Sequence, residues 1–255
     1  MARILVTNDD GVASPGLHAL YRALAPLGEV LLVAPDVERS SIGHAITTHT
    51  PLRVAEYRDR AGALVGHTVN GTPADCVKIA IGCIHPSRRF DLAVSGVNRG
   101  QNTGTSIIYS GTVSAATEAR ILGVKSIAVS LDSSDPQDWS VAAEFGARVA
   151  RQVLQRGLPD KVLLNVNVPA LPAGQIRGVR VTRQGQSGFE EVFETRSDPR
   201  DQPYLWLAGS FQMTDSEEDT DACALAQGWI SVTPVTHDLT AYGARAEIAG
   251  WGLTP

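Results

Sequence analysis

The feature that most constrains the fold is a short apolar run at residues 4–6, which ends in a polar turn, N-D-D-G, at residues 8–11. A short apolar run that stops at a turn is typical of a parallel strand buried on both faces. Ser14 and Pro15 then predict the start of a helix, because serine is a good N-cap and proline fits the first turn. A second apolar run follows at residues 30–33. The chain therefore begins with a strand, a helix and a second strand, the repeating unit of a parallel α/β sheet.

This alternation continues to about residue 170 and then changes. The further elements expected before that point are strands at residues 52–55, 67–69, 92–94, 127–129 and 162–166, and helices that begin at Thr72 or cover residues 113–122 and 142–154. Later apolar runs, without helices between them, lie at residues 179–181, 189–193, 204–207 and 229–232. We expect one α/β domain over residues 1–255, with a doubly wound, mostly parallel core at 1–170 and a β-rich arm with a C-terminal segment at 171–255. Strands of such arms are often completed by another subunit, so we also expect an oligomer.

Charge and composition exclude several classes of protein. The formal net charge is -5, whereas a surface that binds nucleic-acid polymers usually needs positive charge. No stretch approaches the roughly 18 apolar residues of a membrane span, and the N-terminus lacks a signal-peptide pattern. The three cysteines suggest neither a disulfide framework nor a zinc site, and Cys76 and Cys83 should share the buried face of one helix. We expect a cytoplasmic protein with no membrane or nucleic-acid partner.

Three polar loops follow expected strands of the core. The first carries Asp9 and Asp10, the second (residues 35–44) carries Ser40, and the third (residues 95–100) carries Asn98. Ligands of doubly wound sheets bind beyond the carboxyl ends of the strands, where these loops can converge. Their carboxylate, hydroxyl and carboxamide oxygens suit Mg²⁺, Mn²⁺ or Ca²⁺ rather than zinc. The alternative is a simple tight turn at N-D-D-G, but compatible groups on three loops favour a metal site that leaves room for phosphate and water.

A long segment rich in glycine and asparagine, residues 96–111, leads into the helix expected at residue 113. Ser110, Gly111 and Thr112 stand where that helix starts, so its unpaired amides and the positive end of its dipole can bind a phosphate. An ordinary helix cap is the alternative, although the length and composition of the loop favour a function.

Four other polar residues leave the choice between function and structure open. Arg39 and Arg99 could contact a phosphate or remain solvated. His44 could line the site or carry a proton, but lone histidines are more often structural. Asp75 is expected to cap the helix that begins at Thr72. The acidic run around residue 217 is expected to be solvated.

Six segments spread along nearly the whole chain carry a more specific signal. They are I-L-V-T-N-D-D-G (4–11), A-P-D-V-E-R-S (34–40), N-G-T-P-A-D-C-V (70–77), S-G-V-N-R-G-Q-N (95–102), Y-S-G-T-V (109–113) and T-D-A-C-A-L-A-Q-G-W-I-S-V-T-P (220–234). In these segments the chain resembles the SurE (survival protein E) family of 5′/3′-nucleotidases, which have acid-phosphatase-like activity.

The resemblance has implications for the fold, the site and the activity. It implies a Rossmann-like domain with an exchanged β-arm that forms a homodimer or homotetramer. It implies hydrolysis of nucleoside 5′- and 3′-monophosphates and, in some members, of short polyphosphate, with a link to stress survival through the family name. It implies one divalent metal per subunit, Mg²⁺ or Mn²⁺, with Ca²⁺ as a non-productive occupant. The implied metal ligands are Asp9, Asp10, Ser40 and Asn98, and the implied phosphate pocket is Asn102, Ser110, Gly111 and Thr112.

The mechanism expected from these residues is in-line hydrolysis with Asp9 and Asp10 as catalytic residues. Asp9 either activates a water or attacks phosphorus itself, and the sequence leaves both routes open. A phosphatase with D-x-D geometry is disfavoured because the two carboxylates are adjacent. A dinucleotide oxidoreductase would need G-x-G-x-x-G after the first strand. A metal or nucleotide sensor is the remaining alternative, and it would bind nucleotide without releasing phosphate.

Overall fold

The computed structural model describes residues 1–254. A nine-stranded sheet has the order β3-β4-β2-β1-β5-β6-β7-β11-β8, and β9 pairs with β10 in a separate ribbon. The strands are β1 (Ala2–Thr7), β2 (Gly28–Pro35), β3 (Val54–Arg58), β4 (Leu64–Val69), β5 (Leu92–Arg99), β6 (Lys125–Asp132), β7 (Val162–Pro169), β8 (Val179–Val181), β9 (Gly188–Ser197), β10 (Pro203–Gln212) and β11 (Ile230–Thr236). The α-helices are α1 (Pro15–Leu24), α2 (Pro73–Ile79), α3 (Ser106–Tyr109), α4 (Gly111–Ile121), α5 (Ser140–Arg156), α6 (Asp221–Ala226) and α7 (Arg245–Ala249).

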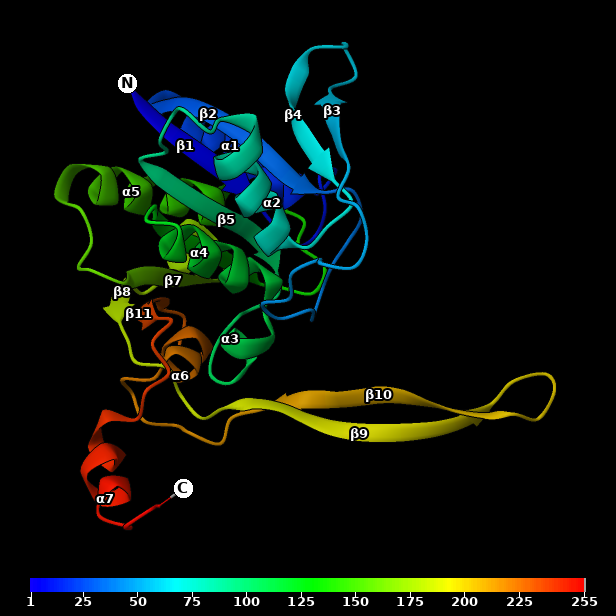
Figure 1. Ribbon diagram of the computed structural model, residues 1–255, viewed down its shortest axis with the longest axis vertical. Coiled ribbons are helices and arrows are strands. Elements are labelled where there is room, and N and C mark those ends of the chain that lie inside the picture. Colours follow the sequence, from blue (N-terminus) through cyan, green and yellow to red (C-terminus); the bar gives the residue numbers. More distant parts are fainter. Residues whose placement is uncertain (255) are drawn as a thin grey trace.

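The central strand β1 shows why an uninterrupted apolar run was needed. Successive side chains of a strand point to opposite faces of the sheet. Ile4 and Val6 pack in the core layer formed with α1 and α5, whereas Leu5 packs in the layer formed with α2 and α4. Helices cover both faces, so neither face of β1 meets water. The doubly wound, mostly parallel α/β fold expected from the sequence is confirmed (Figure 1).

The direction of the strand order reverses beside β1. This strand pairs in parallel with β2 on one side and with β5 on the other. The chain leaves β1 toward α1 in one helix layer and leaves β5 toward α4 in the opposite layer. Loops that diverge in this way open the ligand crevice of doubly wound sheets at the carboxyl ends of the two strands.

The helix starts follow the capping chemistry to different degrees. Thr72 and Asp75 form a complete capping box at α2, which confirms the structural role expected for Asp75. Ser110 caps α4 by accepting a hydrogen bond from the amide of Val113. Ser14 occupies the N-cap position of α1 as expected, but its side chain makes no capping hydrogen bond.

Three local expectations differ from the structure. The third loop begins later than expected, because β5 continues through an irregularity between Ser95 and Asn98 as far as Arg99. The strand expected at residues 52–55 lies instead at Val54–Arg58, where it pairs antiparallel with β4. Cys83 is exposed although Cys76 is buried, because the chain winds as a π-helix over Ala80–Ile84 and the seven-residue spacing no longer keeps both on one face.

The chain beyond residue 170 contributes to two different structures. β11 adds to the central sheet by pairing antiparallel with β7, and β8 pairs in parallel with β11 at the edge. In contrast, β9 and β10 pair only with each other, over ten residues each, and extend away from the body of the molecule as an arm (Figure 1). Within residues 1–254, no helix has both the length and the hydropathy needed to cross a membrane.

Candidate metal and phosphate site

The N-D-D-G turn is fixed in the crevice beside β1 by the chain around it. The side-chain amide of Asn8 donates to the carbonyl of Gly11 at 3.0 Å, and Gly11 has φ +93°, a conformation that favours glycine. The loop after β2 packs against the turn, because the amide of Arg39 donates to the carbonyl of Asp9 at 2.7 Å. Two of the three loops expected to converge therefore touch.

Asp9 lies buried against the first turn of α4. Its Oδ1 accepts a hydrogen bond from the hydroxyl of Thr112. A Cβ at Gly111 would lie 2.7 Å from the Cβ of Asp9 and 2.8 Å from its Oδ2, so only glycine lets the helix approach this closely. Burial raises the pKa of Asp9, while hydrogen bonds from Thr112 counteract part of that effect.

Asp10 adds a second carboxylate beside the first. Its Oδ2 accepts the backbone amide of Arg99 at 3.2 Å, which brings the third loop into the site. Burial, and after it the charge of Asp9, raises the pKa of Asp10 to about 6. A positive partner between two adjacent carboxyl groups would lower both pKa values and so favour the charged forms.

Asn98 presents an oxygen to the same point. Its side-chain amide donates to the carbonyls of Arg99 at 3.1 Å and Gly100 at 2.8 Å, which fixes its orientation and leaves its Oδ1 3.2 Å from the hydroxyl oxygen of Thr112. A hydroxyl has one hydrogen, and that of Thr112 goes to the carboxylate of Asp9. Asn98 Oδ1 therefore lies beside the hydroxyl that binds Asp9, without a donor of its own.

These groups fit a hard divalent cation. Two carboxylates and a carboxamide oxygen converge without enough donors to satisfy them, and Asn8 Oδ1 nearby is buried without a hydrogen-bond partner. Among residues 1–254, no group of three His, Cys, Asp or Glu side chains is placed to hold a metal. Any cation here would thus take part of its coordination from hydroxyl, amide or water oxygens, as the sequence predicts.

Ser40 is in the expected loop, but its side chain is directed elsewhere. The residue is exposed, and its hydroxyl donates to Glu38 at 2.7 Å. Glu38 also pairs with Arg99 at 3.1 Å, and its charge adds to the causes that raise the pKa values of Asp9 and Asp10. Sequence reasoning missed Glu38. The only signal for it was an acidic residue two positions before Ser40.

Of the residues predicted to bind phosphate, Gly111 and Thr112 lie against Asp9. Ser110 is the helix cap, and Gly111 and Thr112 occupy the first turn, where backbone amides have no partner within the helix. Asn102 is buried, and its side chain donates to the hydroxyl of Ser130 at 2.9 Å. Ser110 is thus a helix cap, and this role is compatible with the prediction that the same turn binds an anion.

The remaining polar candidates are paired within the chain. Arg39 bonds Asp36 at 3.4 Å and the carbonyl of Asn70 at 3.3 Å. His44 bonds the buried carboxylate of Glu118 at 2.8 Å, so it links the second loop to α4. This partner favours a structural role for His44.

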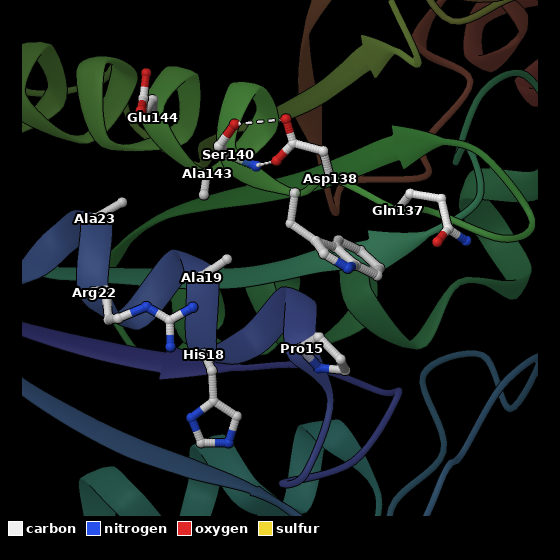
Figure 2. Close-up of a pocket in the computed structure, with 11 residues that line it drawn as sticks. Pro15, His18, Ala19, Arg22, Ala23, Gln137, Asp138, Ser140, Ala143 and Glu144 are labelled. Atoms are coloured by element: carbon white, nitrogen blue, oxygen red, sulfur yellow. Dashed lines mark hydrogen bonds between the residues drawn. The ribbon is translucent and has the colours of Figure 1, made fainter.

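A surface cavity of about 620 Å³ lies apart from these groups, between α1 and the start of α5 (Figure 2). His18 and Arg22 of α1, Asp138 before α5 and Glu144 on α5 are among its lining residues. None of the residues that line it belongs to the predicted site. The cavity therefore adds nothing to the assignment of the metal and phosphate groups.

The fold and the site together define the class of protein. This is a Rossmann-like α/β protein with carboxylate oxygens and a helix N-terminus together at the topological switch point, an arrangement suited to phosphate chemistry.

The particular family follows from comparison with known proteins. Residues 4–191 match the family described as Survival protein SurE, and the chain belongs to that family. Proteins called 5′-nucleotidase SurE from Syntrophobacter fumaroxidans and Moorella thermoacetica are 51% and 49% identical to it. These matches cover 98% and 97% of this chain and 100% and 95% of the relatives. The crystal structure of the SurE protein from Aquifex aeolicus is 40% identical, with a TM-score of 0.85 over 97% of this chain and 98% of that chain.

Proposed function

We propose that this protein is a metal-dependent 5′-nucleotidase that hydrolyses nucleoside monophosphates to nucleoside and phosphate. The observation that carries the proposal is the seating of Asp9 against Gly111 and Thr112 at the start of α4. This contact puts candidate cation ligands and candidate phosphate donors side by side. Relatives of near-equal length that share about half of its residues carry the same activity in their names.

Each part of the proposed site has a distinct task. Asp9, Asp10, Asn98 and, after rotation of its side chain, Ser40 would hold one divalent cation, Mg²⁺ or Mn²⁺. When bound, this cation would neutralise charge on the phosphate and favour ionisation of a water. The first turn of α4 would donate its amides to the phosphate oxygens, and Asn102 would line the same pocket. Asp9 and Asp10 would be the catalytic residues, with Asp9 acting on the water or on phosphorus.

The proposal extends beyond 5′-monophosphates. Acceptance of 3′-monophosphates and short polyphosphate is inferred from the sequence resemblance. We also propose self-association through the arm, which is supported by the apolar side chains exposed along β9 and β10. Three free cysteines support a reducing, cytoplasmic location.

Phosphate release by metal-stripped protein tests the proposal. We expect no release from AMP, GMP or their 3′ isomers until Mg²⁺ or Mn²⁺ is added. The variant Asp10→Ala should not recover activity under the same conditions. A matched control is Asp160→Ala, which removes an exposed carboxylate far along the sequence from the site and should behave as the wild type. A folded wild type that releases no phosphate with any metal would instead indicate a sensor.

A further inference from the structure

The segment at residues 102–105 connects two parts of the proposed phosphate pocket. Asn102 stands at its start, and after the short helix α3 the chain reaches Ser110 and the first turn of α4. Its carbonyls at residues 103–105 accept amides at the start of α3, but the amides of Asn102, Gly104 and Thr105 are bonded to groups outside the segment. The contacts that hold it come from β7 and from the root of the arm, which we define as residues 183–187 before β9 and residues 213–221 after β10.

The first contact is made by Asn167 of β7. Its side-chain oxygen accepts the amide of Asn102 at 2.7 Å, and its side-chain nitrogen donates to the carbonyl of the same residue at 3.0 Å. Asn165 donates to that carbonyl as well, at 2.8 Å. The backbone of Asn102 is therefore fixed by the rigid central sheet.

Gly104 and Thr105 are held by the root of the arm. The amide of Gly104 donates to Oδ2 of Asp221 at 2.9 Å, and the amide of Thr105 donates to the carbonyl of Ser187 at 2.9 Å. The side chain of Gln184 donates to the carbonyl of Gly104 at 2.8 Å. Gly104 has φ +53°, and a Cβ there would collide with the carbonyl of Ser187. The root and the segment are thus in direct contact.

Asp221 is the side chain that binds both parts at once. While Oδ2 takes the amide of Gly104, Oδ1 takes the amide of Gly185 in the root, at 3.0 Å, and that of Ala222 at 2.9 Å. Asp221 is fully buried, and its carboxylate is not required to cap α6, because the hydroxyl of Thr220 accepts the amide of Cys223 there. The carboxylate of Asp221 therefore joins two distant segments: Gly104 lies 117 residues before it in the sequence, and Gly185 lies 36 residues before it.

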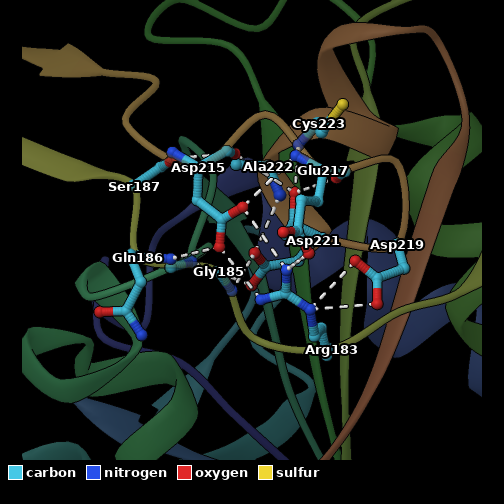
Figure 3. A network of polar contacts seen from close by, with 12 residues as sticks. Arg183, Gly185, Gln186, Ser187, Asp215, Glu217, Asp219, Asp221, Ala222 and Cys223 are labelled. Carbon is cyan, nitrogen blue, oxygen red and sulfur yellow. Dashed lines mark hydrogen bonds and ion pairs between the residues drawn. The ribbon is translucent and has the colours of Figure 1, made fainter.

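A second network braces the same root from the solvent side. Arg183 bonds Asp215 at 3.0 Å, Glu217 at 2.5 Å and Asp219 at 3.0 Å (Figure 3). The acidic run expected to be merely solvated is therefore partly neutralised by one guanidinium. This outer network touches no residue of the 102–105 segment, so it provides a control for the inner contact.

We propose that Asp221 is a positioning residue for phosphate binding, which holds the 102–105 segment in place against the root of the arm. The proposal rests on the proposed function, because it concerns the same phosphate pocket. Its consequence is that the position of the arm and the affinity of the pocket are connected through one carboxylate.

The test compares Asp221→Asn with Arg183→Gln in the full-length, metal-loaded protein. Asparagine keeps the shape of aspartate, but its amide nitrogen must face either Gly104 or Gly185, donor against donor. We expect the KM for AMP and the inhibition constant of inorganic phosphate to rise together, by about tenfold or more, because displacement of binding groups is costly. Arg183→Gln should leave both constants within about twofold, because in the described part of the chain the Arg183 side chain bonds only Asp215, Glu217 and Asp219 and leaves the contacts of Asp221 with Gly104 and Gly185 in place.

The readouts separate positioning from loss of folded protein. A smaller folded fraction lowers only the apparent kcat, whereas a misplaced segment changes KM and phosphate inhibition. Hydrogen exchange at residues 102–105 should also be faster in Asp221→Asn than in Arg183→Gln, and it can be measured whether or not the protein turns over. Unchanged KM and phosphate inhibition, or unchanged exchange, in folded Asp221→Asn overturns the proposal. A wild type that releases no phosphate contradicts the proposed function instead, and the exchange comparison then still decides whether Asp221 holds the segment.

Discussion

Two regions of the molecule differ in which groups find partners within the chain. One is the site edge, by which we mean the carboxyl ends of β1, β5 and β7 with the loops that follow them, and the other is the arm formed by β9 and β10. At the site edge, buried polar side chains such as those of Asp9, Asn102 and Asn167 are bonded to other parts of the same chain. Along the arm, the backbone is paired within the ribbon, but large apolar side chains are left in solvent. Phe193 and Leu205 are 62% exposed, and Trp206 and Leu207 are 56% exposed.

This difference shows which region is complete in one chain. Buried polar groups that are bonded to other parts of the chain hold one arrangement, which suits a site that must present its remaining free oxygens in advance. An isolated two-stranded ribbon is marginally stable in water, and exposed apolar side chains on it indicate a missing surface. This contrast supports the proposals that the site edge binds a cation and substrate and that the arm binds another protein surface.

The largest effect is expected from Asp9→Asn. Asparagine can still accept the hydroxyl of Thr112, but the cation would lose a charged ligand, so kcat should fall by about a thousandfold. The metal-free variant should unfold at the same temperature as the wild type or higher, because burial penalises the charge that is removed. Phosphate release and a thermal melt measure the two effects. Near-normal turnover would show that Asp9 is not the catalytic carboxylate.

A smaller loss is expected from Gly111→Ala. The new methyl group would lie 2.7 Å from the Cβ of Asp9, so the helix or the carboxylate must move. We expect kcat/KM to fall by about a hundredfold, because small displacements of reacting groups are costly. Gly174→Ala is the control, since a Cβ there meets nothing within 4 Å. Equal kinetics for the two variants would mean that α4 and Asp9 are not closely coupled.

Substitutions in the arm should change the association of subunits rather than the rate of phosphate release. Leu207 pairs with Phe193 on one face of the ribbon, and Ser210 lies on the other face. If that apolar face contacts another copy of the chain, Leu207→Glu should raise the dissociation constant of the oligomer by about tenfold or more, as a buried contact would require. Sedimentation of Leu207→Glu and Ser210→Glu measures the difference. Identical behaviour of the two variants would place the contact elsewhere.

The smallest expected effect is on the free energy of unfolding. It comes from replacing a residue in the left-handed backbone conformation, once in the core and once in the arm. Lys161 precedes β7 in the core and Asp201 lies in the turn of the arm, with φ 60° and 58°. Glycine relieves the strain of this conformation, so Lys161→Gly should raise the free energy of unfolding by about 0.5 kcal/mol. Asp201→Gly should leave the global transition unchanged, because the arm contributes little to the folding of the core. Denaturant unfolding measures both changes. A higher free energy of unfolding in Asp201→Gly would show that arm and core unfold together.

The sequence by itself determined the fold class and the centre of the site. The apolar run before N-D-D-G requires a strand covered on both faces, and the Thr72 and Asp75 spacing determines a helix cap. Both are local effects that operate within a few residues. The same local chemistry indicated that Asp9 and the glycine at residue 111 stand where a strand ends and a helix begins.

Only the tertiary structure decided how distant segments join. β8 and β11 enter the central sheet although they lie beyond residue 170, because strand partners are chosen by the edge that is free and not by the pattern of the strand. The role of Asn167 becomes visible only in the structure, where it accepts the amide of Asn102, 65 residues away in the sequence. In the sequence Asp221 ends the acidic run that was expected to be solvated, but in the structure it is fully buried. The cost of burying its carboxylate is offset because the amides of Gly104 and Gly185 donate to it in the folded chain. No local sequence pattern predicts these two contacts.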